Sequence, residues 1–254
     1  MAKIRSSGKS LNFTNSYYNQ LAAVVYANVF GYPLTVKEAR LWAIRKTRAE
    51  YSQQKEEAAI KLTNQLKKIP TIAAVFLTGS VAARNASKTA DIDLMVVTVP
   101  NTLWLTRLFV FPWLKRNFCP NIFLDLNHLE IKDRNLFTAH EVLKAKCLYD
   151  YGGVYKKWLE DNIWTKKYLP LVYSASLRAN AKQSPDVPKQ IASSLWFLAM
   201  TPLELFAFIL QYLYMKPKMT HEKVGWGYAF FHPNNLSEKV LKKFEKELLK
   251  YTDK

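Results

Sequence analysis

Two short segments concentrate residues that could bind a phosphorylated ligand and a metal ion. Gly79 and Ser80 follow the apolar run 71–78, and Asp91 and Asp93 open a second apolar run. A glycine lets a phosphate approach the backbone, and the Ser80 hydroxyl and the amides that open a helix can donate hydrogen bonds to it. Because side chains alternate along a strand, Asp91 and Asp93 share one face, and their spacing suits joint ligation of Mg²⁺.

A third carboxylate is expected on a neighbouring strand. Asp125 is the only acidic residue in the apolar run 121–129 (NIFLDLNHL). Two aspartates in an apolar strand repel each other and are costly to bury unless a cation neutralises them. We therefore expect Asp91, Asp93 and Asp125 to converge on Mg²⁺ or Mn²⁺. Asp125 would bind a second metal ion or accept a proton during in-line displacement at the α-phosphorus of a nucleotide.

The order of these segments resembles the signature of the DNA polymerase beta-like nucleotidyltransferase superfamily. The chain reads LTGS at 77–80, DIDL at 91–94 and LDL at 124–126, so the resemblance covers about residues 71–130. It implies a small mixed sheet with helices. It also implies transfer of a nucleoside monophosphate from a nucleoside triphosphate to a hydroxyl acceptor, which stays open between a protein, an RNA and a small molecule.

The same resemblance implies roles for individual residues. Asp91, Asp93 and Asp125 would be the catalytic metal ligands, and Gly79 and Ser80 would contact the triphosphate. The loop that follows carries two further candidates for phosphate contact, Arg84 and Lys88.

One departure from the pattern concerns that loop. Minimal members of the superfamily carry Ala-Arg-Gly after the Gly-Ser turn, and this chain has Ala-Arg-Asn at 83–85. Asparagine tolerates left-handed backbone geometry better than most residues, so we expect the turn to be kept.

Periodicity places the candidate site in a chain of class α/β (α+β), with a small mixed sheet flanked by helical regions. We predict three regions: a helical, winged-helix-like N-terminal region at 1–68, a catalytic domain at 69–150 and a helical C-terminal domain at 151–254. Strands are expected at 71–78, 91–99 and 121–129. Helices are expected at 17–29, from Thr35 onward, and at 50–68, 103–118, 138–148, 154–168, 188–215 and 237–251.

Charge and composition limit the partners. The 254 residues carry a net charge of +17, distributed as +8, +2 and +7 over 1–68, 69–150 and 151–254. Positive flanks favour polyanions such as nucleoside triphosphates, and they leave open a rival hypothesis: an inactive nucleotidyltransferase fold that binds nucleic acid. The apolar stretch 195–215 is long enough to be weighed as a membrane span, but Pro202 and Glu204 inside it favour a buried helix. Two cysteines without a CxxC pair, and no apolar leader, predict a cytoplasmic protein. Membrane attachment through 195–215 stays open as a third hypothesis, less favoured than the other two.

Overall fold

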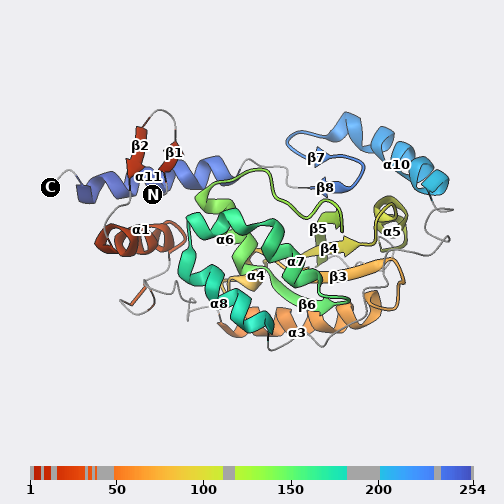
Figure 1. Cartoon of the computed structure of the whole chain (residues 1–254), viewed down its shortest axis with the longest axis horizontal. Helices are drawn as coiled ribbons and strands as arrows, with labels where there is room; N and C mark the ends of the chain where they lie inside the picture. The colour runs from red at the N-terminus through yellow and green to blue at the C-terminus, as the bar shows by residue number, and fades with distance from the viewer. Residues whose placement is uncertain are drawn as a thin grey trace.

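The computed structural model describes residues 3–6, 9–12, 16–31, 34–35, 38, 49–110, 118–181, 201–231 and 236–252. Its centre is a six-stranded sheet in the order β6-β3-β4-β5-β8-β7 (Figure 1). The strands are β3 (Ile72–Leu77), β4 (Ile92–Thr98), β5 (Phe118–Asp125), β6 (Lys146–Asp150), β7 (Lys223–Val224) and β8 (Tyr228–Phe230). Within this sheet β4 and β5 run parallel, and the other neighbours are antiparallel.

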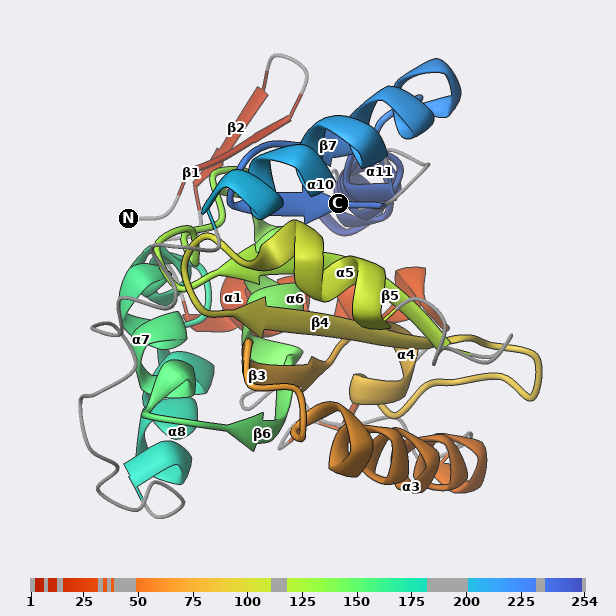
Figure 2. The same ribbon diagram turned by 90° about the vertical axis from the view of Figure 1, so that its right-hand side faces the viewer.

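Helices cover both faces of the sheet. One face packs against α3 (Ala49–Leu66), the short α4 (Gly79–Ala82), α5 (Leu103–Val110) and α10 (Thr201–Met215) through a first core cluster. The other face packs against α6 (Leu136–Lys144), α7 (Val154–Asp161), η2 (Ile163–Lys167) and α8 (Pro170–Ala181) through a second cluster. Figure 2 shows the sheet with α5 and α10 above it and α7 and α8 beside it.

The strands alternate between these two clusters. In β4, Ile92, Leu94 and Val96 belong to the first cluster, whereas Met95 and Val97 belong to the second. Side chains on a strand point to opposite faces in turn, so this alternation fixes the side on which every β4 residue lies.

The two ends of the chain meet beside this sheet. Helix α1 (Ser16–Val29) packs against α11 (Leu236–Thr252) in a third cluster that also includes Leu136 of α6. Tyr26 of α1 stacks on His140 of α6, with ring centroids 4.0 Å apart. A separate hairpin of β1 (Lys3–Ser6) and β2 (Lys9–Asn12) precedes α1. The remaining short element is η3 (Lys216–Lys218), which continues α10.

The predicted fold class, a mixed sheet flanked by helices, is confirmed. The strands expected at 71–78 and 91–99 are β3 and β4, and the helix expected at 50–68 is α3. The capping box that opens at Thr35 is also present, because its backbone N–H and hydroxyl both donate to the Glu38 carboxylate and the Glu38 N–H donates back to Thr35 Oγ1. The rest of that helix lies outside the described residues.

Other expectations need correction. The helix expected at 138–148 ends at Lys144, and residues 146–150 form the edge strand β6. The regions at 1–68 and 151–254 are not purely helical, because the first contains the β1–β2 hairpin and the second supplies β7 and β8 to the central sheet. Strands this short carry too few residues for a period to be recognised. The part of the predicted helix 188–215 that precedes Thr201 lies outside the described residues, as do 111–117 of the helix expected at 103–118.

Candidate active site

The Gly-Ser corner and the aspartate pair meet at one end of β3 and β4. Gly79 adopts φ +63°, a left-handed conformation that favours glycine. A Cβ atom at Gly79 would lie 2.2 Å from Oδ2 of Asp93, so no side chain fits there. The Thr78 N–H donates a 3.0 Å hydrogen bond to the Asp93 carbonyl, which keeps the two strands together at this corner. The structure therefore brings the Gly79 backbone against the Asp93 carboxylate, and contact of Ser80 with a triphosphate stays a prediction.

Helix α3 holds the loop that leads to Asp91. The Ala86 N–H donates to the hydroxyl of buried Ser52, at 3.0 Å, and the Lys55 ammonium donates to the carbonyl of Ala90, at 2.6 Å. Each contact joins residues more than thirty positions apart. The backbone that leads to Asp91 is thus held by a helix outside the motif.

The two loop residues proposed to contact phosphate, Arg84 and Lys88, are both exposed. Arg84 itself takes the left-handed conformation, with φ +52°, and the Asn85 N–H donates to the Ser80 carbonyl at 2.8 Å. The expectation that Asn85 supplies the left-handed residue is therefore wrong, because the turn closes one residue earlier. Contact of Arg84 or Lys88 with a nucleotide stays a prediction.

The Asp93 carboxyl lies in a partly buried and negative environment. Burial, followed by the charges of Glu141 and Asp91, raises its pKa from 3.8 to about 7. Asp93 lies opposite Cys119 at the start of β5, and burial, followed by the charges of Asp93 and Asp91, raises the pKa of the Cys119 thiol. The buried amide of Asn121 donates to Asp93 Oδ1 at 2.8 Å. Within the described residues, its own Oδ1 is buried and has no hydrogen-bond partner.

Glu141 was not among the residues that the sequence predicts for the site. It lies on α6, on the face of the sheet to which Asp93 points by the alternation of β4. Burial raises the pKa of Glu141, and the charge of Lys144 opposes that shift. The sequence offered one signal, the one acidic residue of 136–144, LFTAHEVLK. The proximity of Glu141 to Asp93 depends on how α6 packs on the sheet.

Asp125 does not join the other two aspartates. In the parallel register of β4 and β5, Asp93 lies opposite Cys119 and Asp125 lies opposite Thr98. Five residues of β4 therefore separate the two positions, which is about 16 Å along a strand. The expected convergence of three carboxylates is wrong, because β5 begins at Phe118 and Asp125 is its last residue.

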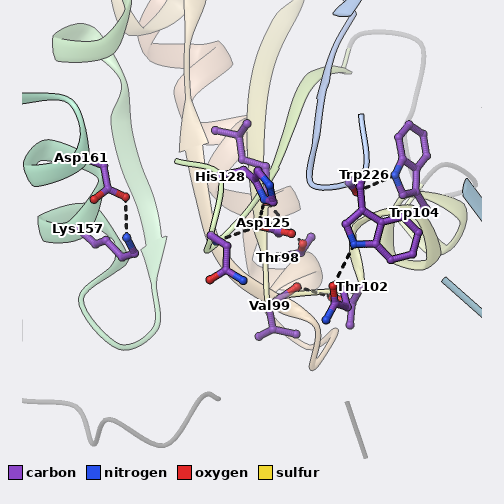
Figure 3. Close-up of polar contacts among 12 residues, drawn as sticks. Thr98, Val99, Thr102, Trp104, Asp125, His128, Lys157, Asp161 and Trp226 are labelled. Carbon is purple, nitrogen blue, oxygen red and sulfur yellow. Dashed lines mark hydrogen bonds and ion pairs between the residues drawn. The ribbon is translucent and has the colours of Figure 1, made fainter. Parts of the chain in front are cut away.

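Asp125 has a structural environment of its own (Figure 3). Only 2% of it is exposed, and its Oδ1 accepts hydrogen bonds from the Asn127 N–H at 2.8 Å and from His128 Nδ1 at 2.7 Å. Its own N–H donates to the carbonyl of Gly227 at 2.9 Å. These contacts close the turn after β5 and join it to the segment that leads into β8. The Asp125 carboxylate thus has its hydrogen-bond donors within its own turn.

The side chains at this corner supply part of the expected Mg²⁺ site. Among the residues that the structure describes, no group of three or more His, Cys, Asp and Glu side chains is placed to hold a metal ion. Asp91 and Asp93 nevertheless form a pair of oxygen donors, and the charge of Asp91 is one of the causes that raise the pKa of Asp93. Mg²⁺ is commonly bound by one or two carboxylates together with substrate phosphates and waters. The pair therefore fits a metal ion that arrives with a nucleotide, and it does not form a complete cage by itself.

The comparisons with known proteins agree with this geometry. Residues 60–152 match the family model described as polymerase beta, nucleotidyltransferase. The match begins in α3, includes the Gly-Ser corner and the aspartate pair, and ends just after β6. No curated protein matches the chain. The chain therefore carries a nucleotidyltransferase domain of the polymerase beta-like superfamily.

Proposed function

We propose that this protein is a metal-dependent nucleotidyltransferase that moves a nucleoside monophosphate from a nucleoside triphosphate to a hydroxyl acceptor, with release of pyrophosphate. The observation that carries the proposal is the contact between the Gly79 backbone and the Asp93 carboxylate, within the segment that matches the family. A phosphate that approaches the glycine would lie next to the carboxylate pair.

Asp91 and Asp93 are the proposed ligands of Mg²⁺ or Mn²⁺, and Gly79 and Ser80 are the proposed contacts of the triphosphate. The bound metal ion would neutralise phosphate charge and polarise the α-phosphorus for attack. Asn121 fixes the orientation of the Asp93 carboxylate through its hydrogen bond to Oδ1. That bond leaves Oδ2, the oxygen nearest to Gly79, directed at the corner where the phosphates would lie.

Glu141 is the proposed acceptor of the proton from the attacking hydroxyl. It is the carboxylate from another element whose charge raises the pKa of Asp93, and its own pKa is raised by burial. A raised pKa brings a carboxylate closer to the range in which a general base works best. In this proposal Glu141 takes the role that the sequence had given to Asp125.

A matched pair of variants tests the proposal. Nucleotide binding is measured with a fluorescent nucleoside triphosphate, with Mg²⁺ and with EDTA, so that the result does not depend on the acceptor. Asp93→Asn is expected to weaken the Mg²⁺-dependent binding roughly 100-fold, because one of two carboxylate ligands is lost. Asp125→Asn is expected to leave it within about threefold, since that side chain lies at the far end of the sheet.

Transfer is measured separately, with labelled nucleoside triphosphates and a cell extract as the source of acceptors. Label transfer that Asp93→Asn and Glu141→Gln abolish, and that Asp125→Asn preserves, is the expected result. Equal loss in Asp93→Asn and Asp125→Asn would contradict the assignment of the site.

A second candidate function is a nucleotidyltransferase fold that has lost catalysis and binds nucleic acid through its basic flanks. One observation favours this alternative. The β5 residues beside Asp93 are Cys119 and Asn121, whereas a third carboxylate was expected there. Binding to DNA or RNA would then weaken steeply with salt, in proportion to the phosphates neutralised. Steep salt dependence together with nucleotide binding that ignores Mg²⁺ would support this alternative over the enzyme.

A further inference from the structure

Helix α10 has an inverted distribution of polar and apolar residues. Its outward-facing side chains are large and apolar, and Phe206, Leu213 and Tyr214 are 67%, 62% and 70% exposed. The full set, which we call the α10 outer face, consists of Leu203, Leu205, Phe206, Ile209, Leu210, Leu213 and Tyr214. Scattered apolar side chains are normal on a protein surface, whereas seven on one helix form a contiguous patch typical of an interaction site.

The polar residues of α10 are those that point inward. The Glu204 carboxylate is fully buried and accepts hydrogen bonds from the N–H groups of Trp104, at 2.6 Å, and Leu105, at 2.9 Å. Gln211 donates to the Trp104 carbonyl at 2.8 Å and accepts from the Arg107 guanidinium. Glu204 thus caps the amino-terminal end of α5, where a negative charge is stabilised by the helix dipole.

These contacts fix the rotation of α10. Turning the outer face toward the core would remove Ala207, Phe208 and Met215 from the first core cluster. It would also leave the N–H groups of Trp104 and Leu105 without the Glu204 acceptor, which is costly. The hydrogen bonds of Glu204 and Gln211 therefore keep the outer face directed to solvent. Figure 2 shows α10 as an outermost element of the molecule, above α5. The neighbouring helix α5 also exposes Leu108 and Phe109.

The charges around the outer face indicate what covers it. In the fully described stretch 201–218, the charged side chains that reach solvent are Lys216 and Lys218. Their ammonium groups lie 5.8 Å and 4.1 Å from the ring centroids of Tyr212 and Tyr214, so lysines and tyrosines share the carboxyl end of the helix. A second copy of the chain would bring another net charge of +17 against this one, which opposes self-association. An anionic lipid surface supplies the opposite charge.

We propose that the α10 outer face docks on an anionic membrane surface, with the helix lying in the plane of the headgroups. None of the described helices is long and apolar enough to cross a membrane. An interfacial helix of this kind buries large apolar side chains below the headgroups and keeps lysines at their level. The docking surface lies on the first-cluster side of the sheet, whereas Asp93 points to the second-cluster side. Docking therefore leaves the proposed nucleotide site open.

The experiment is cosedimentation of the full chain with phosphatidylcholine vesicles, with and without phosphatidylglycerol, at low and high salt. Wild type is expected to bind the anionic vesicles and not the neutral ones. The triple variant Phe206→Ser, Leu210→Ser, Leu213→Ser keeps the net charge and is expected to bind at least about tenfold more weakly. Lys216→Ala with Lys218→Ala is expected to weaken binding about tenfold and to reduce its salt dependence.

The matched control replaces three exposed apolar residues elsewhere, Tyr151→Ser, Ile163→Ser and Leu171→Ser. It is expected to bind vesicles like wild type. The proposal is overturned if wild type stays in solution with every vesicle, or if the α10 triple variant binds as well as wild type. It is also overturned if wild type is a dimer by light scattering and the same triple variant makes it a monomer, because the outer face would then belong to a second copy.

Discussion

The two acidic sites of this protein, Asp93 and Asp125, lie in neighbouring parallel strands and have opposite environments. Asp125 is almost fully buried, and a backbone N–H and His128 donate to the same oxygen. Asp93 lies beside Asp91 and near Glu141, and burial among these charges raises its pKa to about 7. A buried carboxylate that accepts hydrogen bonds from neighbouring residues, as Asp125 does, has a structural role. One that is placed against other negative charges costs stability, and such sites are typical of ligand binding.

Each of the two carboxylates also has a glycine against it, and substituting Gly79 should have the largest effect on stability. Gly79→Ala is expected to destabilise the protein by about 2–5 kcal/mol, because the new Cβ meets Asp93 and the backbone is left-handed. Gly227→Ala meets His128 Nδ1 and Asp125 Oδ2, but the half-exposed His128 can move. We expect it to cost about 1–2 kcal/mol. Urea unfolding of both variants measures the difference.

Gly153→Ala is the control for the backbone conformation alone. Gly153 has φ +77°, and no described atom lies within 4 Å of a Cβ placed there. Its cost should be about 1 kcal/mol, so the excess of Gly79→Ala over Gly153→Ala isolates the contact with Asp93. Equal costs would show that Asp93 moves aside freely.

Asp125→Ala should destabilise the fold by about 1–3 kcal/mol, because the Asn127 N–H and His128 lose their acceptor. The same variant should retain Mg²⁺-dependent nucleotide binding. Chemical denaturation and nucleotide titration of one preparation test both statements, and loss of binding in a variant that remains folded would contradict them.

Asp93→Asn should stabilise the protein at neutral pH, in contrast to Asp125→Ala. The folded pKa of Asp93, about 7, lies above its ordinary value of 3.8, so its contribution to stability is present at low pH and is lost as pH rises through 7. The variant should therefore exceed wild type by about 1–3 kcal/mol at pH 8, with the gap narrowing toward pH 4. Denaturation from pH 5 to pH 8 measures the gap, and a gap independent of pH would show that Asp93 is not under electrostatic strain.

The smallest expected effect concerns the loop that carries Asp91. Ser52→Ala removes the acceptor of the Ala86 N–H, and we expect it to cost about 1 kcal/mol and to weaken nucleotide binding a few-fold. Gln53→Ala, on the exposed neighbouring position of α3, is the control and should change neither quantity. Binding unaffected by Ser52→Ala would mean that the loop holds its position without α3.

The local sequence pattern was sufficient to predict the two strands that carry Gly79 and Asp93. It was insufficient to predict which residues of other elements lie near them. The apolar runs before Gly79 and after Asp91 predicted β3 and β4, because fully buried strands are continuously apolar. The role of Asp125 depended on the register of β4 and β5, which no local pattern encodes. Glu141 reaches the vicinity of Asp93 only through the packing of α6 on the sheet.

The sequence pattern of helix α10 also did not predict which of its faces is buried. Periodicity in 201–215 predicts a helix, and the expectation that an apolar helix is buried follows from composition. The structure instead buries Glu204 and Gln211. Glu204 accepts from the N–H groups of Trp104 and Leu105, which have no partner within α5, and Gln211 donates to the Trp104 carbonyl. The inward face of α10 is therefore the one that pairs with backbone groups of α5, a segment about a hundred residues earlier in the chain.

Parallel strands cannot be joined by a tight turn, so the chain must leave β4 and return through a crossover before it starts β5. Helix α5 lies in that crossover, and its first N–H groups are held by Glu204 of α10. The connection between the strand of Asp93 and the strand of Asn121 is therefore hydrogen-bonded to α10. Loss of the Glu204 carboxylate would leave the first N–H groups of α5 without that acceptor, inside the crossover that joins the two strands.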